Sequence, residues 1–314
     1  MSRNTKSVPD QFLSTISEAI ALLDAMPATT PLLPNSQSEP LPSLLDQCHA
    51  LLERSVLQSR EPIRTLHHFA CTGGTVISKC LSAMPNVQLL SEVNPLSAQA
   101  FASKDRFFPT DLPRLAKQSS RSADTHLLLK IFQSGITTLY QDTLEKGLRL
   151  ILRDHSHSQF CFGELDTQRP SLRSALSSHY RVCSAVTVRH PIDSYLSIQN
   201  NGWMHFSPPS IDEYAVRYLA FLDHFADCTI FKYEDFVAKP DEMLTSLCAA
   251  LEIPFSTTYR DAFSAYRLSG DSGRAGNTIS QRERREIPEH VRQETKKSKN
   301  WNELCCRLDY SNTL

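Results

Sequence analysis

Short apolar runs that alternate with longer helical stretches are the feature that most restricts how this chain can fold. From residue 63 onward, five such runs occur, at 63–70, 86–92, 148–153, 181–189 and 228–233. Each run is short enough for one buried strand, and the intervals leave room for crossover helices. The alternation predicts an α/β fold in which helices flank a central, mostly parallel sheet in three layers.

One interval, 111–147, contains an apolar run, THLLLKIF, that suits either a strand or a helix. Apolar residues recur there at every fourth position, at Leu128, Phe132, Ile136, Tyr140 and Leu144. This spacing places them along one face of a helix. We therefore predict a helix here, despite Gly135, and the next strand at 148–153.

The first sixty residues have a different texture. Helical periodicity occurs from Phe12 to Leu23 and again from about Ser43 to Leu57, and five prolines in 27–42 prevent one continuous helix. We predict an N-terminal helical appendage with a Pro-rich linker over 1–60 and one large α/β domain over 61–314. Two interpretations of the appendage stay open. It packs on the main domain, or it docks to a partner or to a second copy of the chain in a homo-oligomer.

Charge and cysteine content narrow the function classes. The 314 residues include 33 basic and 34 acidic side chains, which leave a net charge of -1. This balance provides no general field for nucleic acid or an anionic membrane, so any anion site has to be local. Nine cysteines show no CxxC pair, and no apolar run approaches the ~18 residues of a membrane span. We expect no zinc site, disulfide framework, nucleic-acid partner or membrane span, and a reducing, cytoplasmic location.

A candidate phosphate site lies between the first predicted strand and the helix after it. The segment HHFACTGGTVIS places Thr72, Gly73, Gly74 and Thr75 in that turn. Two glycines permit a tight or left-handed backbone whose N–H groups turn toward an anion, and the following helix adds its N-terminal dipole. An ordinary tight turn is the alternative. The signature GxxxxGK[ST] is absent, which disfavours ATP.

This loop resembles the 5′-phosphosulfate loop of sulfotransferases that use 3′-phosphoadenosine 5′-phosphosulfate (PAPS), which reads approximately Lys/Arg-Ser/Thr-Gly-Thr/Gly-Thr. Residues 72–75 match that loop, whereas Cys71 stands where the family usually carries a basic residue. The resemblance implies a P-loop-like fold, and it implies that the basic residue stabilises the departing phosphosulfate bridge. Arg153, or Lys79 one turn into the helix, is the candidate replacement for that charge.

A second element, RHPIDSYLS at 189–197, follows a predicted strand. Arg189 offers a planar fork of donors to a phosphate, and the hydroxyl of Ser197 closes on the same anion if the turn folds back, with Pro191 starting a helix. A salt bridge is the alternative for Arg189 alone. The segment resembles the family's 3′-phosphate element, Arg-x-Pro-x-Asp-x-x-x-Ser, at every fixed position. This implies that Arg189 and Ser197 bind the 3′-phosphate.

Two later segments continue the resemblance in the family's order. FKYEDFVAKP resembles the segment after the last core strand, which implies that Tyr233 lies against the adenine; a core tyrosine is the alternative. Glu234, beside it, fits a bracing role. DSGRAG at 271–276 resembles a late Arg-x-Gly element, which implies that Arg274 and Gly276 lie on the 3′-phosphate side.

A histidine and a glutamate compete for the role of general base. Sulfuryl transfer needs a base for the acceptor's proton and positive charge near the leaving oxygen, and histidine's unperturbed pKa of ~6.5 suits the first task. Arg153-Asp154-His155 resembles the family's Lys-x-His element, so we predict His155 as the base, with Arg153 beside it and His157 in reserve. Glu92, at the end of the second strand, is the competitor because some branches of the family use a glutamate there.

Together these residues predict an enzyme, a PAPS-dependent sulfotransferase that moves the sulfuryl group to an acceptor hydroxyl by in-line transfer and releases 3′,5′-adenosine bisphosphate (PAP). The acceptor is a small molecule or a glycan, and segment 200–214, with Trp203 and Phe206, either lines the acceptor cleft or is a packed loop. No metal is required, because N–H, arginine and hydroxyl groups hold the phosphates. The alternatives are a P-loop nucleotide or small-molecule kinase and a nucleotide-binding module without catalysis.

Overall fold

The computed structural model describes residues 60–104, 107–270, 278–280 and 283–312, together with Ser17, Ala21, Ser43, Asp46 and Gln47. The chain divides into two units, Met1–Glu53 and Arg54–Leu314. The predicted appendage falls almost entirely outside the described residues, so the domain boundary near residue 60 stays a prediction. Arg274 and Gly276 also lie outside the described residues.

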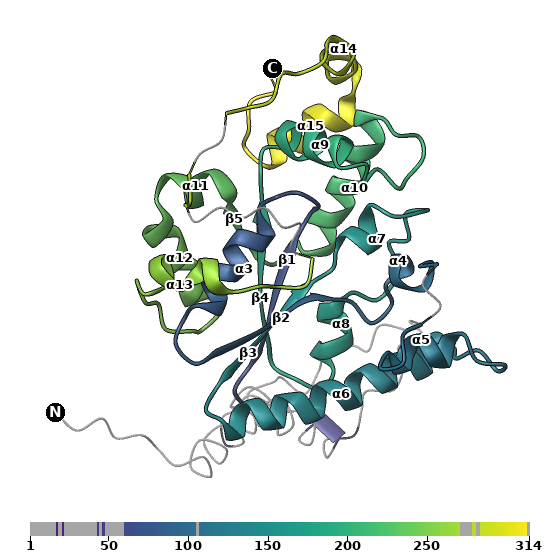
Figure 1. Ribbon diagram of the computed structural model, residues 1–314, viewed down its shortest axis with the longest axis vertical. Helices are drawn as coiled ribbons and strands as arrows, with labels where there is room; N and C mark the ends of the chain where they lie inside the picture. Colours follow the sequence, from purple (N-terminus) through teal and green to yellow (C-terminus); the bar gives the residue numbers. More distant parts are fainter. Residues whose placement is uncertain are drawn as a thin grey trace. The chain divides into compact units, whose positions relative to one another are not determined.

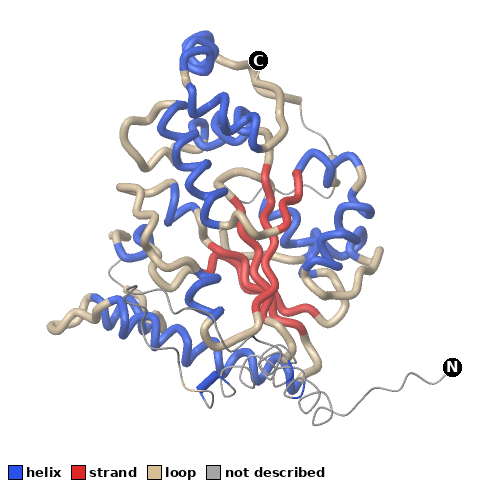
Figure 2. Tube along the Cα trace, turned by 180° about the vertical axis from the view of Figure 1, so that it is seen from behind, coloured by secondary structure: helices blue, strands red, loops and turns tan. Residues whose placement is uncertain are grey.

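Five parallel strands form the centre of the larger unit (Figures 1 and 2). They are β1 (Ile63–His68), β2 (Val87–Val93), β3 (Arg149–Asp154), β4 (Val182–Val188) and β5 (Thr229–Lys232). Their order across the sheet is β2-β3-β1-β4-β5, and every neighbouring pair runs parallel. Each strand coincides with a predicted run, and the predicted fold class is confirmed. The order reverses beside β1, where α/β sheets open a crevice at the carboxyl ends of their strands.

Helices connect and cover these strands. They are α3 (Gly74–Ser82), α4 (Ala98–Phe101), α5 (Leu112–Lys117), α6 (Thr125–Glu145), α7 (His157–Phe160), α8 (Leu172–Ser177), α9 (Pro191–Asn200), α10 (Ile211–His224), α11 (Tyr233–Ala238), α12 (Pro240–Ala250), α13 (Tyr259–Ala262), the 3-10 helix η1 (Phe263–Ala265), α14 (Glu289–Lys297) and α15 (Lys299–Arg307). No helix among the described residues is both long and apolar enough to cross a membrane.

Successive side chains of the strands point to opposite faces, and each face packs against its own helical layer. On one face, Leu66, Ile151 and Ala185 belong to a buried cluster with α3, α11, α12 and α13. On the other, Leu152 packs with α6 and α8, and Val186 packs with α9, α10, α14 and α15. The sheet is therefore the middle of three layers, as the alternating sequence predicts.

The ambiguous interval forms the long helix α6, as its spacing predicts. The side chain of Asp124 caps its first turn by accepting a hydrogen bond from the backbone N–H of Leu127. Ile136 and Tyr140 of the predicted stripe are buried, but Leu144 is 40% exposed. In this last turn the buried side chain is Thr143, which donates a hydrogen bond to Oε1 of Gln88 in β2 at 3.0 Å.

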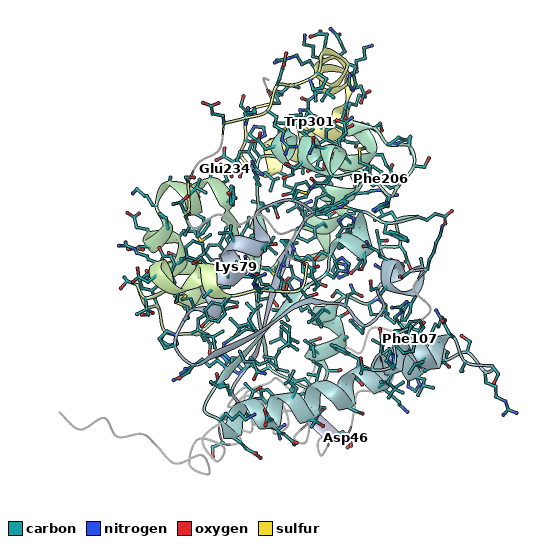
Figure 3. The ribbon with its side chains drawn as sticks, viewed as in Figure 1. Asp46, Lys79, Phe107, Phe206, Glu234 and Trp301 are labelled. Carbon is teal, nitrogen blue, oxygen red and sulfur yellow. The ribbon has the colours of Figure 1, made fainter. Side chains whose placement is uncertain are left out.

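The last two helices complete the core on the α10 side of the sheet. Trp301 of α15 is fully buried against α10, and Figure 3 shows it deep among these helices. Ser298 caps α15 by accepting a hydrogen bond from the N–H of Trp301 at 2.9 Å. This packing fixes the helices that follow β4 and so positions the residues at its carboxyl end.

Candidate active site

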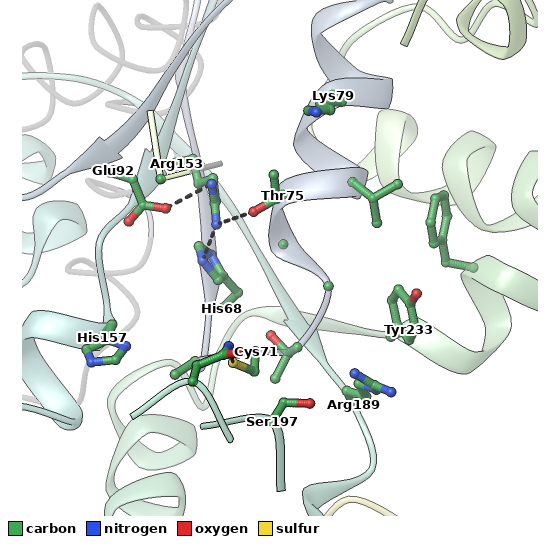
Figure 4. A pocket seen from close by; sticks show the side chains of 18 of the residues that line it. His68, Cys71, Thr75, Lys79, Glu92, Arg153, His157, Arg189, Ser197 and Tyr233 are labelled. Atoms are coloured by element: carbon green, nitrogen blue, oxygen red, sulfur yellow. Dashed lines mark hydrogen bonds and ion pairs between the residues drawn. The ribbon is translucent and has the colours of Figure 1, made fainter. Parts of the chain in front are cut away.

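A cavity of about 400 Å³ opens at the carboxyl ends of the strands (Figure 4). Four strands each place one functional side chain on its wall: β1 ends at His68, β2 contains Glu92, β3 contains Arg153, and Arg189 directly follows β4. Because parallel strands end at the same edge of the sheet, residues far apart in the sequence meet here.

The glycine turn lines one side of this cavity and leads into α3. Gly73 precedes the helix with φ 88°, in the left-handed region that favours glycine. A Cβ on Gly73 would lie 2.2 Å from Cδ2 of Tyr233, and a Cβ on Gly74 would lie 2.6 Å from Cδ2 of His68. Gly73 is therefore required both by its backbone shape and by the close approach of Tyr233, and Gly74 by the close approach of His68.

Cys71 stands at the entrance to this turn, with φ 64°. It is half-buried and lines the cavity, and its Sγ accepts a hydrogen bond from Nδ2 of Asn201 at 3.7 Å. A cysteine side chain therefore occupies the point where the resemblance expects a cation.

Arg189, Ser197 and Tyr233 form the wall opposite β2 and β3. The guanidinium carbon of Arg189 lies 5.1 Å from the centroid of the Tyr233 ring, close enough for a cation–π contact. Among the described residues, the ion pairs that arginine side chains form with carboxylates do not include Arg189. Ser197, in the second turn of α9, donates to the backbone carbonyl of Asp193 at 2.7 Å and still lines the cavity.

Glu234 supports the Arg189 side from behind. Its carboxylate accepts a hydrogen bond from the backbone N–H of His190 at 3.0 Å and another from the hydroxyl of Tyr310 at 2.5 Å. These contacts tie the start of α9 to α11, which is the bracing role that the sequence suggests for Glu234.

Arg153 is the most heavily bonded charge of the site. Only 4% exposed, it donates hydrogen bonds to Oγ of Ser91 at 2.8 Å, Nε2 of His68 at 2.9 Å and Oγ1 of Thr75 at 3.2 Å. It also forms an ion pair with Glu92 at 2.8 Å (Figure 4). Of the two predicted replacements for the missing cation, Arg153 is the one that contacts the glycine turn directly, through Thr75.

Glu92 and His155, the two candidates for the base, lie side by side. Oε2 of Glu92 is 3.6 Å from Nε2 of His155, and both side chains are partly exposed to the cavity. Glu92 has φ 61° at an irregularity in the pairing of β2 with β3. Gly270 covers it so closely that a Cβ there would lie 2.4 Å from Oε1 of Glu92.

Burial keeps two histidines of the site neutral. Desolvation, followed by the charges of His155 and His205, lowers the pKa of His157 from 6.5 to about 3. Desolvation, followed by the neighbouring Arg153 guanidinium, lowers the pKa of His68 well below 6.5. No three His, Cys, Asp or Glu residues in the described part of the chain are placed to hold a metal ion.

Segment 200–214 divides between the two interpretations open for it. Trp203 lines the cavity, whereas Phe206 is 6% exposed and belongs to the core. Sequence reasoning missed several wall residues, of which His68 and Gln99 carry polar side chains. His68 could have been found as the polar residue that ends β1, but no pattern signals Gln99, which lies on a single helical turn, α4.

No family model matches the sequence, and no curated protein matches it. Solved structures do match: the sulfotransferase domain from the Synechococcus PCC 7002 olefin synthase superposes with a TM-score of 0.52 at 15% identity, over 81% of this chain and 97% of that one. This chain has the sulfotransferase fold. The sulfotransferase domain from the curacin biosynthetic pathway matches with a TM-score of 0.48 at 15% identity, over 81% and 99% of the two chains. Mouse sulfotransferase SULT7A1 complexed with PAP matches with a TM-score of 0.40 at 11% identity, over 82% and 93%.

The sulfotransferase fold confirms the predicted three-layer α/β architecture and the family resemblance at the level of the fold. The cavity lies at the carboxyl edge of its sheet, and it collects the predicted residues Thr72 to Thr75, Glu92, Arg153, His155, Arg189, Ser197 and Tyr233.

Proposed function

We propose that this chain is a PAPS-dependent sulfotransferase that transfers a sulfuryl group to an acceptor hydroxyl. The observation that carries the proposal is one cavity in which a glycine turn at a helix N-terminus, an arginine, an aromatic ring and a histidine meet. Anion-binding groups and a base side by side are what a sulfuryl transfer site needs.

The residues fit the donor in two places. The N–H groups around Gly73 and Gly74, where a Cβ would collide with neighbouring rings, would hold the 5′-phosphosulfate at the start of α3. Arg189 and Ser197 would hold the 3′-phosphate, and the ring of Tyr233 offers a stacking face to the adenine. PAPS, when bound, supplies the sulfuryl group.

His155 is the base that we favour. Glu92 already forms an ion pair with Arg153 at 2.8 Å, so protonation of that carboxylate would remove the negative charge that stabilises the pair. Its other oxygen lies 3.6 Å from Nε2 of His155, which suits a group that orients the imidazole. We therefore assign proton removal to His155 and its orientation to Glu92.

Arg153 supplies the positive charge that Cys71 lacks. It is buried, so its interaction with a developing negative charge is little screened by water. It reaches the glycine turn through Thr75 at 3.2 Å, on the side where the bridging oxygen of the donor would leave. The acceptor hydroxyl would approach from the His155 side.

Ligand-dependent thermal unfolding tests the donor assignment. PAP at about one hundred times its dissociation constant should stabilise the protein by about 2.7 kcal/mol, which is about 5 to 10 °C for a domain of this size. Arg189→Gln should weaken PAP binding by about tenfold or more, because it removes charge-assisted hydrogen bonds, whereas Arg121→Gln on the exposed surface should not. Stabilisation by ATP with Mg²⁺ and not by PAP would refute the proposal in favour of a kinase.

Transfer itself is tested with radiolabelled PAPS and a panel of hydroxyl acceptors. The proposal expects labelled product with at least one acceptor and its loss in His155→Ala. Near-normal turnover in His155→Ala together with inactivity of Glu92→Ala would exchange the roles assigned to these two residues. Tight PAP binding without transfer to any acceptor would instead identify a binding module.

A further inference from the structure

The cavity has a second end that the donor residues do not occupy. In Figure 4, Tyr233 and Arg189 lie on one side, while His157 and Glu92 lie on the opposite side. Gln99 and Trp203 also line the cavity. If the donor occupies the Arg189 side, as proposed above, the acceptor has to reach His155 from this second end.

Two polar atoms at this end have no hydrogen-bond partner among the described residues. Both Nε2 of His157 and Oε1 of Gln99 are buried at the atomic level. They come from α7 and α4, which pack against each other, and both residues line the cavity. Buried polar atoms without partners are costly, and two at one place indicate a ligand that provides hydrogen bonds there.

An aromatic wall stands beside His157. The Trp203 indole is 6.0 Å from the His157 ring, centroid to centroid, at an interplanar angle of 77°. His205 lies 5.9 Å from His157 on the same side. A flat indole next to hydrogen-bonding groups suits a ligand with one apolar face and a polar edge.

The charges at this end favour a neutral ligand. Burial holds the pKa of His157 at about 3, so its imidazole is uncharged at neutral pH. Arg153, a buried cation of the cavity wall, is paired with Glu92 at 2.8 Å. A carboxylate or phosphate on the acceptor would meet the Glu92 carboxylate on this side, and the two like charges would repel each other.

We infer that the acceptor is a sugar whose reacting hydroxyl faces His155 while neighbouring hydroxyls bond Nε2 of His157 and Oε1 of Gln99, with the ring's apolar face on Trp203. This inference rests on the proposed function. In the transfer, the sugar oxygen forms a bond to sulfur as the bond from sulfur to the 5′-phosphate oxygen breaks. The hydroxyl proton passes to His155, and PAP leaves. A phenol or simple alcohol has one hydroxyl and would leave both buried atoms unpaired.

The first test compares acceptors on the unmodified protein. With saturating PAPS, p-nitrophenyl glycosides of glucose, galactose and mannose are compared with p-nitrophenol and benzyl alcohol. The inference expects at least one glycoside to exceed both simple acceptors by about tenfold or more in kcat/KM. Monodeoxy analogues of the best glycoside should then lose about tenfold to hundredfold at the one or two positions adjacent to the sulfated hydroxyl.

The second test changes the protein and includes a readout independent of turnover. Binding of the best glycoside to the PAP complex is measured by calorimetry in His157→Phe and Gln99→Leu, with His179→Phe on the exposed surface as the matched control. Each site variant should bind the glycoside about tenfold more weakly and no longer distinguish one of the deoxy analogues, while its PAP affinity stays unchanged.

The outcomes separate the two proposals. PAP binding and sulfuryl transfer to p-nitrophenol or benzyl alcohol, equal to or better than to every glycoside, would overturn the sugar assignment and leave the sulfotransferase proposal standing. Unchanged glycoside affinity and unchanged deoxy discrimination in both site variants would overturn it as well. Absence of PAP binding would refute the proposed function itself.

Discussion

Replacing Gly73 with alanine should damage the donor site more than the fold. The new Cβ would lie 2.2 Å from Cδ2 and 2.5 Å from Cε2 of Tyr233, whereas ordinary van der Waals contact begins at 3.4 Å. The ring therefore has to move by about 1 Å, and it moves away from the place where we expect the adenine. Loss of one base-stacking contact is worth about 1–3 kcal/mol, so PAP affinity should fall about tenfold to hundredfold.

The same substitution also strains the backbone, which requires a control. Gly73 has φ 88°, and alanine in the left-handed region costs roughly 1–2 kcal/mol of folding stability. Gly147 has φ 67°, and a Cβ added there would have no neighbouring atom within 4 Å. Gly147→Ala should therefore lose similar folding stability without any loss of PAP affinity.

Calorimetric titration with PAP, combined with thermal unfolding of the free proteins, distinguishes the two effects. Gly73→Ala is expected to be weak in PAP binding and Gly147→Ala is expected to bind normally. If Gly73→Ala binds PAP within about threefold of Gly147→Ala, the glycine turn and Tyr233 do not hold the nucleotide, and the proposed donor geometry is wrong.

Three further predictions follow from the charged and strained parts of the site. Arg153→Met should lower kcat, measured with radiolabelled PAPS, by about 10²–10³. Cys71→Lys should restore part of that loss in the Arg153→Met variant and should change kcat little in the unmodified protein. A large gain in kcat from Cys71→Lys alone would mean that Arg153 does not supply the positive charge near the leaving oxygen. Gly270→Ala should push the Glu92 carboxylate aside and lower kcat without weakening PAP binding. A fall in PAP affinity as large as the fall in kcat would contradict this prediction. The pKa of His157 is about 3 in the folded protein and about 6.5 in the unfolded chain, so below pH ~6.5 the unfolded state binds a proton and the free energy of unfolding falls as pH decreases. Chemical denaturation of His157→Phe should show a loss of stability between about pH 7.5 and about pH 5 that is smaller by about 2 kcal/mol than in the unmodified protein. Identical pH dependence of the two proteins would refute the low pKa of His157.

The sequence predicts the strands and the residues at their ends well, because strand length and strand order decide which side chains share one edge of a sheet. Arg189 and Tyr233 are examples: each directly follows a strand. The relation between Glu92 and His155 could not be predicted. They look like competitors in the sequence, and only the irregular pairing of β2 with β3 puts their side chains within 3.6 Å.

Other parts of the site depend on tertiary packing that leaves no periodic signal. Gln99 reaches the cavity because a four-residue helix, α4, packs on α7. Leu144 continues a perfect spacing but is 40% exposed, because its neighbour Thr143 is the side chain that faces β2 in that turn. The predicted roles of Arg274 and Gly276 stay predictions, since both lie outside the described residues.

The hydrogen bonds of Arg153 also bear on how such a site can change during evolution. One guanidinium joins His68, Thr75 and Glu92, which belong to three different segments of the chain. Substitution at any one of these positions leaves a buried donor or charge of another residue without its partner, so single replacements are disfavoured. Sequences that retain a cysteine at position 71 should therefore keep this quartet as a set, whereas those with a lysine or arginine there should be free to vary it. An alignment of relatives that carry both types would show whether the four positions co-vary with residue 71.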